Sequence, residues 1–282
     1  MSRHNLLGAM EGRLLPKYQG RFQAHPVGYW QEEFSIAADL DLDCIEFILD
    51  FNDYEINPLL RPDGPEELLR LGEQTGVKVQ TVCADYFMEA PLHHADENVA
   101  AHSQSVLRRL LTHGEFLGLT DIVIPCVDKS SLTDAPAQDR LVESLLPLAA
   151  EAERAGINLS LETDLAPQAF ADLLERFDSR RVTVNYDTGN SAGLGFDPSE
   201  ELACYGERIS DIHIKDRLLG RGSVILGTGD TQFERFFAAL RPLGYTGPFI
   251  LQAYRDDEGV AVFKQQLAWV RERYLDGAWT SA

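Results

Sequence analysis

The sequence predicts an α/β protein that folds as a single (β/α)8 barrel spanning residues 1–282. Short apolar runs of strand length alternate with longer segments of helical periodicity, which is typical of parallel sheets built from β-α units. Eight such units follow one another, and 282 residues is close to the roughly 250 of one such barrel. No Gly-x-Gly-x-x-Gly turn follows the first strand, so a closed barrel is favoured over a doubly wound open sheet.

Predicted strands and helices follow one another in strict alternation, which predicts a TIM barrel. The strands are predicted at residues 6–10, 44–49, 78–83, 121–125, 158–162, 182–186, 209–214 and 249–252. The helices are predicted at residues 30–40, 65–75, 97–117, 137–155, 167–177, 199–205, 231–240 and 259–274. A glycine that can end a helix in the left-handed conformation precedes several strands, as at Gly118 and Gly156.

Two connecting segments are long enough to carry function. They cover residues 11–29 and 84–96, and each follows the carboxyl end of a predicted strand. In a barrel of this kind both segments overhang the end where active sites lie.

The composition excludes some classes of partner. The formal net charge is −20, so a nucleic acid or an anionic membrane surface would be repelled. No basic and apolar leader pattern and no apolar run near 18 residues is found, which predicts a cytoplasmic protein without a membrane partner. The four cysteines are widely spaced, so no disulfide framework or zinc knuckle is expected.

Each of the last four predicted strands has one polar side chain at or near its carboxyl end. These side chains are Glu162, Asp187, His213 and Gln252. Because the carboxyl ends of parallel strands meet at one end of a barrel, we expect these side chains to converge there. Two carboxylates, one imidazole and one amide oxygen suit one divalent ion such as Mn²⁺, Mg²⁺, Co²⁺ or Fe²⁺, with manganese favoured.

The same motifs carry a resemblance to a known family. The strand-end Glu162, the run Asp187-Thr-Gly-Asn190, the run His213-Ile-Lys-Asp216 and the glycine turn at residues 226–230 resemble the xylose-isomerase-like TIM-barrel superfamily. They are most similar to its sugar phosphate isomerase/epimerase group, which includes ketose 3-epimerases, hydroxypyruvate isomerase and inosose dehydratase. The resemblance implies a metal held by Glu, Asp, His and Glu, with the two glutamates exchanging protons with the substrate.

One position departs from that pattern. Residue 252 is glutamine where the family usually has its second glutamate, and an amide cannot accept a proton from carbon at neutral pH. The prediction is therefore a metal-dependent isomerase or epimerase of a small ketose, polyol or sugar phosphate, with Glu162 as the base. An inosose-dehydratase-like lyase and a carbohydrate-binding barrel without a second base remain alternatives.

Epimerisation stays open because another group could supply the second proton. The candidates are Asp85, Glu89 and a histidine of the loop that holds His93 and His94. Further residues are expected to contact a small carbohydrate substrate, through hydroxyl or phosphate groups. These substrate-binding candidates are Glu46, Asn190, Lys215, Arg217 and Arg221. By analogy with the family, a homo-oligomer is also possible.

Overall fold

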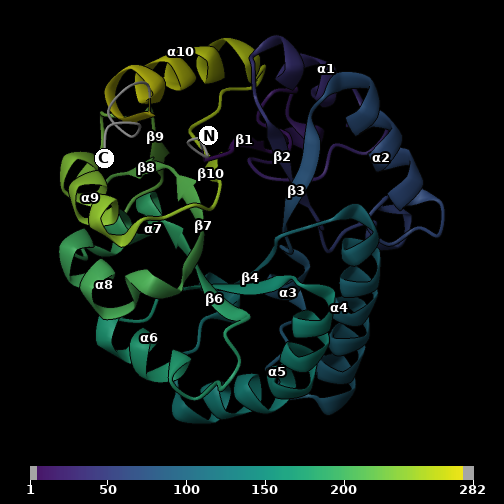
Figure 1. Cartoon of the computed structure of the whole chain (residues 1–282), viewed down its shortest axis with the longest axis vertical. Coiled ribbons are helices and arrows are strands. Elements are labelled where there is room, and N and C mark those ends of the chain that lie inside the picture. Colours follow the sequence, from purple (N-terminus) through teal and green to yellow (C-terminus); the bar gives the residue numbers. More distant parts are fainter. Residues whose placement is uncertain (1–4, 276–282) are drawn as a thin grey trace.

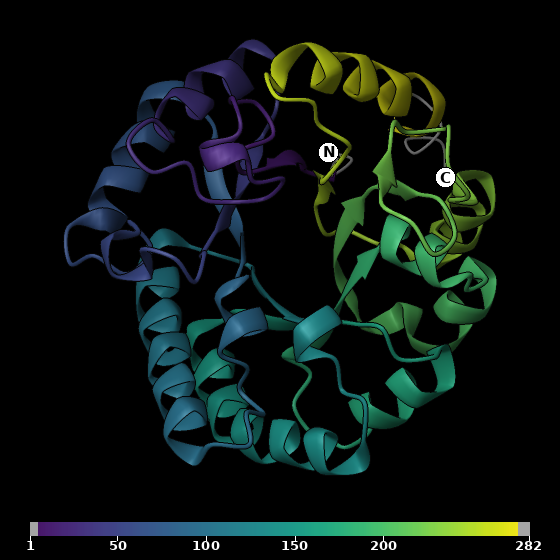
Figure 2. The same cartoon turned by 180° about the vertical axis from the view of Figure 1, so that it is seen from behind.

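The computed structural model describes residues 5–275 and shows eight parallel strands closed into a barrel (Figure 1). Around the barrel the strands lie in the order β1, β2, β3, β4, β5, β6, β7 and β10, and β10 pairs with β1 to close it. Seen from the other side, the helices form a ring outside the strands (Figure 2). The predicted (β/α)8 barrel is confirmed. Residues 1–4 and 276–282 of the predicted single domain lie outside the described residues.

The predicted strands agree with those of the structure to within one residue at each end. The barrel strands are β1 (Leu7–Met10), β2 (Cys44–Ile48), β3 (Lys78–Cys83), β4 (Asp121–Cys126), β5 (Asn158–Thr163), β6 (Val182–Asp187), β7 (Ile209–Ile214) and β10 (Phe249–Leu251). Gln252 therefore lies just beyond its strand.

Each predicted helix is present, although several are shorter than expected. They are α1 (Glu32–Asp39), α2 (Gly64–Thr75), α4 (Glu97–Leu117), α5 (Ala135–Ala155), α6 (Pro167–Leu174), α8 (Pro198–Tyr205), α9 (Phe233–Leu240) and α10 (Val260–Val270). Gly118 and Gly156 take the left-handed conformation after α4 and α5, with φ of 74° and 73°, as the sequence predicts.

Side chains fill both faces of the sheet. Residues such as Ile45 and Phe47 point outward into the large apolar core beneath the helices. A smaller apolar cluster lies inside the barrel and consists of Met10, Cys44, Ile48, Cys83, Val123 and Ile250. Near the amino-terminal ends of their strands, Ser160, Thr183 and Ser210 hydrogen-bond to one another. The interior is thus packed, and the chemistry is left to the carboxyl-terminal mouth.

Helix α7 (Thr188–Leu194) begins directly after β6, whereas the sequence predicts no helix between the strand at residues 182–186 and the helix at residues 199–205. That prediction was wrong for residues 188–194. Glycine is a poor helix former, so the run gives no helical signal of its own. The helix is held at its start by Asp187, whose Oδ1 accepts hydrogen bonds from the backbone N–H of Gly189 and Asn190.

Two further short elements surround the mouth. Helix α3 (Tyr86–Glu89) lies within the long segment after β3. Strands β8 (Asp216–Arg217) and β9 (Ser223–Val224) form a small antiparallel hairpin after β7. Among residues 5–275, no helix is long and apolar enough to cross a membrane.

Asp216 organises the loop that follows this hairpin. Its side chain is buried. Oδ2 accepts from the backbone N–H of Gly227 at 2.9 Å and of Gly229 at 2.8 Å, and Oδ1 accepts from that of Thr231 at 3.1 Å. A Cβ on Gly229 would lie 2.3 Å from Oδ1, so only glycine lets the loop approach this closely.

We expect Asp216→Ala to lower the free energy of unfolding by about 2–4 kcal/mol, because three backbone donors lose a charged acceptor. Asp230→Ala is the matched control. Asp230 is exposed and accepts one bond, from the Leu219 N–H at 2.7 Å, so its loss should cost less than about 1 kcal/mol. Urea unfolding of both variants measures the difference, and equal losses would contradict this role of Asp216.

Candidate active site

Three side chains that can bind a metal meet at the carboxyl ends of β5, β6 and β7. They are Glu162, Asp187 and His213, and all three are buried. One potential ligand atom from each lies within 4.8 Å of the other two. Neighbouring parallel strands bring them together, as the sequence predicts.

Glu46, on β2, orients His213, on β7, across the barrel interior. His213 Nε2 lies 2.7 Å from Glu46 Oε1, and the other oxygen of Glu46 accepts from the Thr81 hydroxyl at 2.7 Å. A carboxylate on Nε2 favours the tautomer that carries its proton there, which leaves a lone pair on Nδ1. That buried Nδ1 has no hydrogen-bond partner among residues 5–275, and it lies 4.0 Å from Asp187 Oδ2. An unpaired imidazole nitrogen that faces a carboxylate oxygen could bind a divalent ion together with that oxygen.

The carboxylate of Asp187 has two distinct contacts. Oδ1 caps helix α7, while Oδ2 faces His213 and accepts from Lys215 Nζ at 3.1 Å. The cap fixes the rotation of the carboxylate, so the direction of Oδ2 is set by the start of α7.

Glu162 lies at the edge of the same group. Its Oε1 accepts a hydrogen bond from the side-chain amide of Asn190, on helix α7. Burial and the nearby charge of Asp187 raise the pKa of Glu162, whereas His213 and Lys215 lower it. A carboxylate whose pKa is raised toward neutrality is a more effective proton acceptor than one in water.

Gln252 faces this group through its oxygen. Its Oε1 accepts from Lys215 Nζ at 2.9 Å, and its Nε2 donates to Gln23 Oε1 at 3.0 Å. The ammonium group of Lys215 therefore lies between Asp187 and Gln252. The donor set of two carboxylates, one imidazole and one amide oxygen fits a hard divalent ion. Coordination by Gln252 itself stays a prediction.

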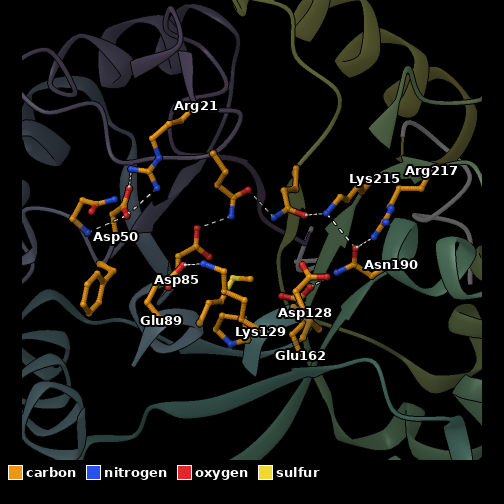
Figure 3. A pocket seen from close by; sticks show the side chains of 17 residues that line it. Arg21, Asp50, Asp85, Glu89, Asp128, Lys129, Glu162, Asn190, Lys215 and Arg217 are labelled. Atoms are coloured by element: carbon orange, nitrogen blue, oxygen red, sulfur yellow. Dashed lines mark hydrogen bonds and ion pairs between the residues drawn. The ribbon is translucent and has the colours of Figure 1, made fainter. Parts of the chain in front are cut away.

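A polar cavity of about 680 Å³ opens above these residues (Figure 3). Its size is within the range of small-molecule sites. The lining residues come from most of the loops at the carboxyl ends of the strands and are Arg21, Gln23, Asp50, Phe51, Asn52, Asp85, Met88, Glu89, Pro125, Val127, Asp128, Lys129, Glu162, Asn190, Lys215, Arg217 and Gln252.

The predicted substrate-binding residues divide into two groups. Asn190, Lys215 and Arg217 line the cavity, and Arg217 Nη1 donates to Asn190 Oδ1 at 2.8 Å. Glu46 has no exposed surface and contacts His213 instead, so it positions that imidazole and does not line the cavity. Arg221 is exposed in the turn between β8 and β9 and does not line the cavity. The geometry does not support a substrate contact for these last two residues.

Several cavity residues were not identified from the sequence. Arg21 binds Asp50 through both carboxylate oxygens, at 2.5 and 3.1 Å, and the pair forms one wall of the cavity (Figure 3). Gln23 lies in the same long loop and donates to Asp85 Oδ2 at 2.8 Å. The loop has no periodicity that could indicate which side chains point inward. Only its length and its position after β1 marked it as functional.

The fold and site together define a TIM barrel with a buried carboxylate–histidine group at its mouth. The chain belongs to the xylose isomerase-like TIM barrel family, whose model matches residues 34–273. This confirms the resemblance seen in the sequence.

Similar proteins with curated names include L-ribulose-5-phosphate 3-epimerases. The L-ribulose-5-phosphate 3-epimerase UlaE of Escherichia coli O1:K1 / APEC is 26% identical over 269 residues, which cover 89% of this chain and 92% of that protein. Among solved structures, the D-allulose 3-epimerase of Methylomonas sp. in complex with D-allulose has a TM-score of 0.75 at 18% identity, with 96% of this chain and 98% of that chain covered. A xylose isomerase-like TIM barrel protein of Mycobacterium smegmatis in complex with magnesium has a TM-score of 0.74 at 19% identity, with 98% of each chain covered. At these identities the two structures support the fold.

Proposed function

We propose that this protein is a divalent-metal-dependent epimerase of small ketoses or ketose phosphates, acting at the carbon next to the carbonyl. The observation that carries the proposal is the buried group of Glu162, Asp187 and His213 at the base of a polar cavity large enough for a sugar phosphate. The epimerase names of the curated relatives support the reaction type.

The residues that would hold the ion are Glu162, Asp187, His213 and Gln252, with manganese or magnesium as the expected metal. When bound there, such an ion would polarise the carbonyl and hydroxyl oxygens of the substrate and so acidify the C–H bond between them. The unpaired Nδ1 of His213 supports this fit. Glu46 would hold the imidazole in place through its contact with Nε2.

Glu162 is the proposed base. Its carboxylate takes the proton from carbon, the electron pair of the broken C–H bond forms the carbon–carbon double bond of an enediolate, and the π electrons of the carbonyl move to its oxygen. Asn190 holds Oε1 of Glu162, so the free oxygen Oε2 is the one that accepts the proton. Arg217 and Lys129 line the outer part of the cavity and are candidates to bind a terminal phosphate or hydroxyl.

A second reaction type is favoured by Gln252. Its amide cannot accept a proton, which leaves Glu162 as the single base of the metal-binding group. A single base can catalyse isomerisation between an aldose and a ketose, or dehydration. The products separate these reactions. A C3 epimer indicates epimerisation, an aldose indicates isomerisation, and loss of water gives a product that absorbs in the ultraviolet.

The test is incubation of the purified protein with Mn²⁺ in D₂O, using L-ribulose 5-phosphate in one sample and D-allulose in another. We expect deuterium to enter at C3 and the C3 epimer to form from at least one of the two, as followed by NMR. Removal of the metal with EDTA should stop both processes. If neither ketose exchanges or epimerises, the proposed function is wrong.

A further inference from the structure

Inversion of a carbon by proton transfer is most direct with two acid/base groups, one on each face of the substrate. We propose that Asp85 is the second proton-transfer residue of this site and acts on the face opposite Glu162. This inference rests on the proposed epimerase function. It assigns to Asp85 the task that the amide of Gln252 cannot perform.

The carboxyl groups that line the cavity are Asp50, Asp85, Glu89, Asp128 and Glu162. Arg21 binds both oxygens of Asp50, and Lys129 Nζ lies 2.6 Å from Glu89 Oε1. Asp128 is exposed to solvent. Within residues 5–275, Asp85 and Glu162 are thus the sheltered cavity carboxyls that form no salt bridge. A group without a fixed ionic partner can change its protonation state during a reaction.

The side chain of Asp85 is directed to the cavity and not to its own helix. Asp85 stands at the start of α3 but makes no capping hydrogen bond there. Its Oδ2 accepts from Gln23 Nε2 at 2.8 Å, and its Oδ1 accepts from Cys83 Sγ at 3.2 Å. Both partners are neutral, so the carboxyl group can be held in place in either protonation state. Burial raises the pKa of Asp85, which makes its acid form more accessible.

A chain of hydrogen bonds ties Asp85 to Lys215 and Gln252 across the cavity. Lys215 donates to Gln252 Oε1, Gln252 donates to Gln23 Oε1, and Gln23 donates to Asp85 Oδ2. Figure 3 shows Asp85 on the side of the pocket with Arg21 and Asp50, while Glu162 lies with Asn190. A substrate bound between Asp85 and Glu162 would have one carboxyl group on each side.

The loop histidines are poorer candidates for the same task. Neither His93 nor His94 lines the cavity. His93 is buried, and desolvation lowers its pKa to about 4. The Nδ1 of His94 accepts a hydrogen bond from the Asp96 backbone N–H at 3.0 Å, which ties it to the loop. Of the second acid/base candidates that the sequence suggests, Asp85 is the one that the geometry supports.

The proton balance of the step is complete without another reactant. Glu162 takes the proton from one face of the carbon, the C–H electron pair forms the carbon–carbon double bond of the enediolate, and the π electrons of the carbonyl move to its oxygen. Protonated Asp85 then delivers its proton to the opposite face, where the double-bond electrons form the new C–H bond and the carbonyl is restored. Glu162 ends protonated and Asp85 ends ionised, and both return to their starting states by exchange with water. The reverse direction uses Asp85 as the base.

The experiment compares Asp85→Asn with Glu162→Gln in D₂O at saturating Mn²⁺. L-Ribulose 5-phosphate and its C3 epimer are supplied separately, and exchange at C3 and epimer formation are both followed by NMR. We expect epimer formation by Asp85→Asn to fall about 10²–10⁴-fold. Exchange of one of the two epimers should stay within about tenfold of the wild type, because its C–H still faces Glu162. Glu162→Gln should exchange only the other epimer.

This reciprocal pattern separates proton transfer from a structural role. Asn keeps an oxygen that can accept from Gln23, so the fold is expected to persist, and a melting curve checks this. Asp178→Asn, an exposed carboxylate, serves as the control. The inference is overturned if Asp85→Asn epimerises at the wild-type rate, exchanges both epimers or exchanges neither. In those cases the wild type still exchanges and epimerises, so the proposed function would stand.

Discussion

Asp187→Asn is expected to weaken Mn²⁺ binding by more than the roughly 10–100-fold that loss of an outer-sphere partner causes, while the fold persists. The reason is that the two oxygens of Asp187 make different contacts. Oδ1 caps α7 through Gly189 and Asn190, and Oδ2 faces His213 Nδ1. Asparagine caps a helix about as well as aspartate, so the substitution removes the negative charge and keeps the cap.

Asp187→Ala is the matched variant, because it removes both functions. It should lose Mn²⁺ binding to the same extent and in addition lower the free energy of unfolding by about 1 kcal/mol. Titration calorimetry with Mn²⁺ gives the affinities, and urea unfolding in EDTA gives the stabilities without metal. Near-normal Mn²⁺ binding by Asp187→Asn would show that the ion is held elsewhere. Equal stabilities of the two variants would contradict the capping role.

The sequence was sufficient for the barrel because its signals are local. Each strand is a short apolar run followed by a helical pattern, and most of these patterns end in a glycine or begin near a proline. Closure and strand order then follow from eight repeats of one unit. The convergence of Glu162, Asp187 and His213 could be predicted for the same reason, since strand ends in such a barrel share one face.

The rest of the site depends on contacts that sequence periodicity does not report. Glu46 and His213 are 167 positions apart, and their hydrogen bond exists only because the barrel closes. Helix α7 is stabilised by a side chain that precedes it, so its glycine-rich sequence resembles a loop. Gln23 and Asp85 lie in long loops whose inward residues are selected by tertiary packing. Local sequence propensity therefore predicts the barrel and its strand-end residues, whereas tertiary contacts determine the chemistry of the site.

Glu162→Gln is expected to reduce epimer formation about 10²–10⁴-fold, the usual contribution of a general base. The amide keeps an oxygen for the metal and a group of the same shape, but it cannot take a proton from carbon. Gln252 already places such an amide oxygen beside Lys215, so the mouth of this barrel accommodates the group. Rates must be measured at saturating Mn²⁺, with the Mn²⁺ affinity determined separately, so that weaker metal binding is not mistaken for loss of the base.

Glu162→Asp is the complementary variant to Glu162→Gln, because it keeps the carboxylate and shortens the side chain by one methylene. Misplacement of a reacting group by about 1 Å costs on the order of 100-fold in rate, so this variant should be slow yet faster than Glu162→Gln. Its carboxylate would also lie farther from the Asn190 amide that holds Oε1 in the wild type. If Glu162→Asp were the slower of the two, side-chain length and not proton acceptance would be the decisive property. Glu162 would then act as a metal ligand alone, and the proton would have to be taken by another group.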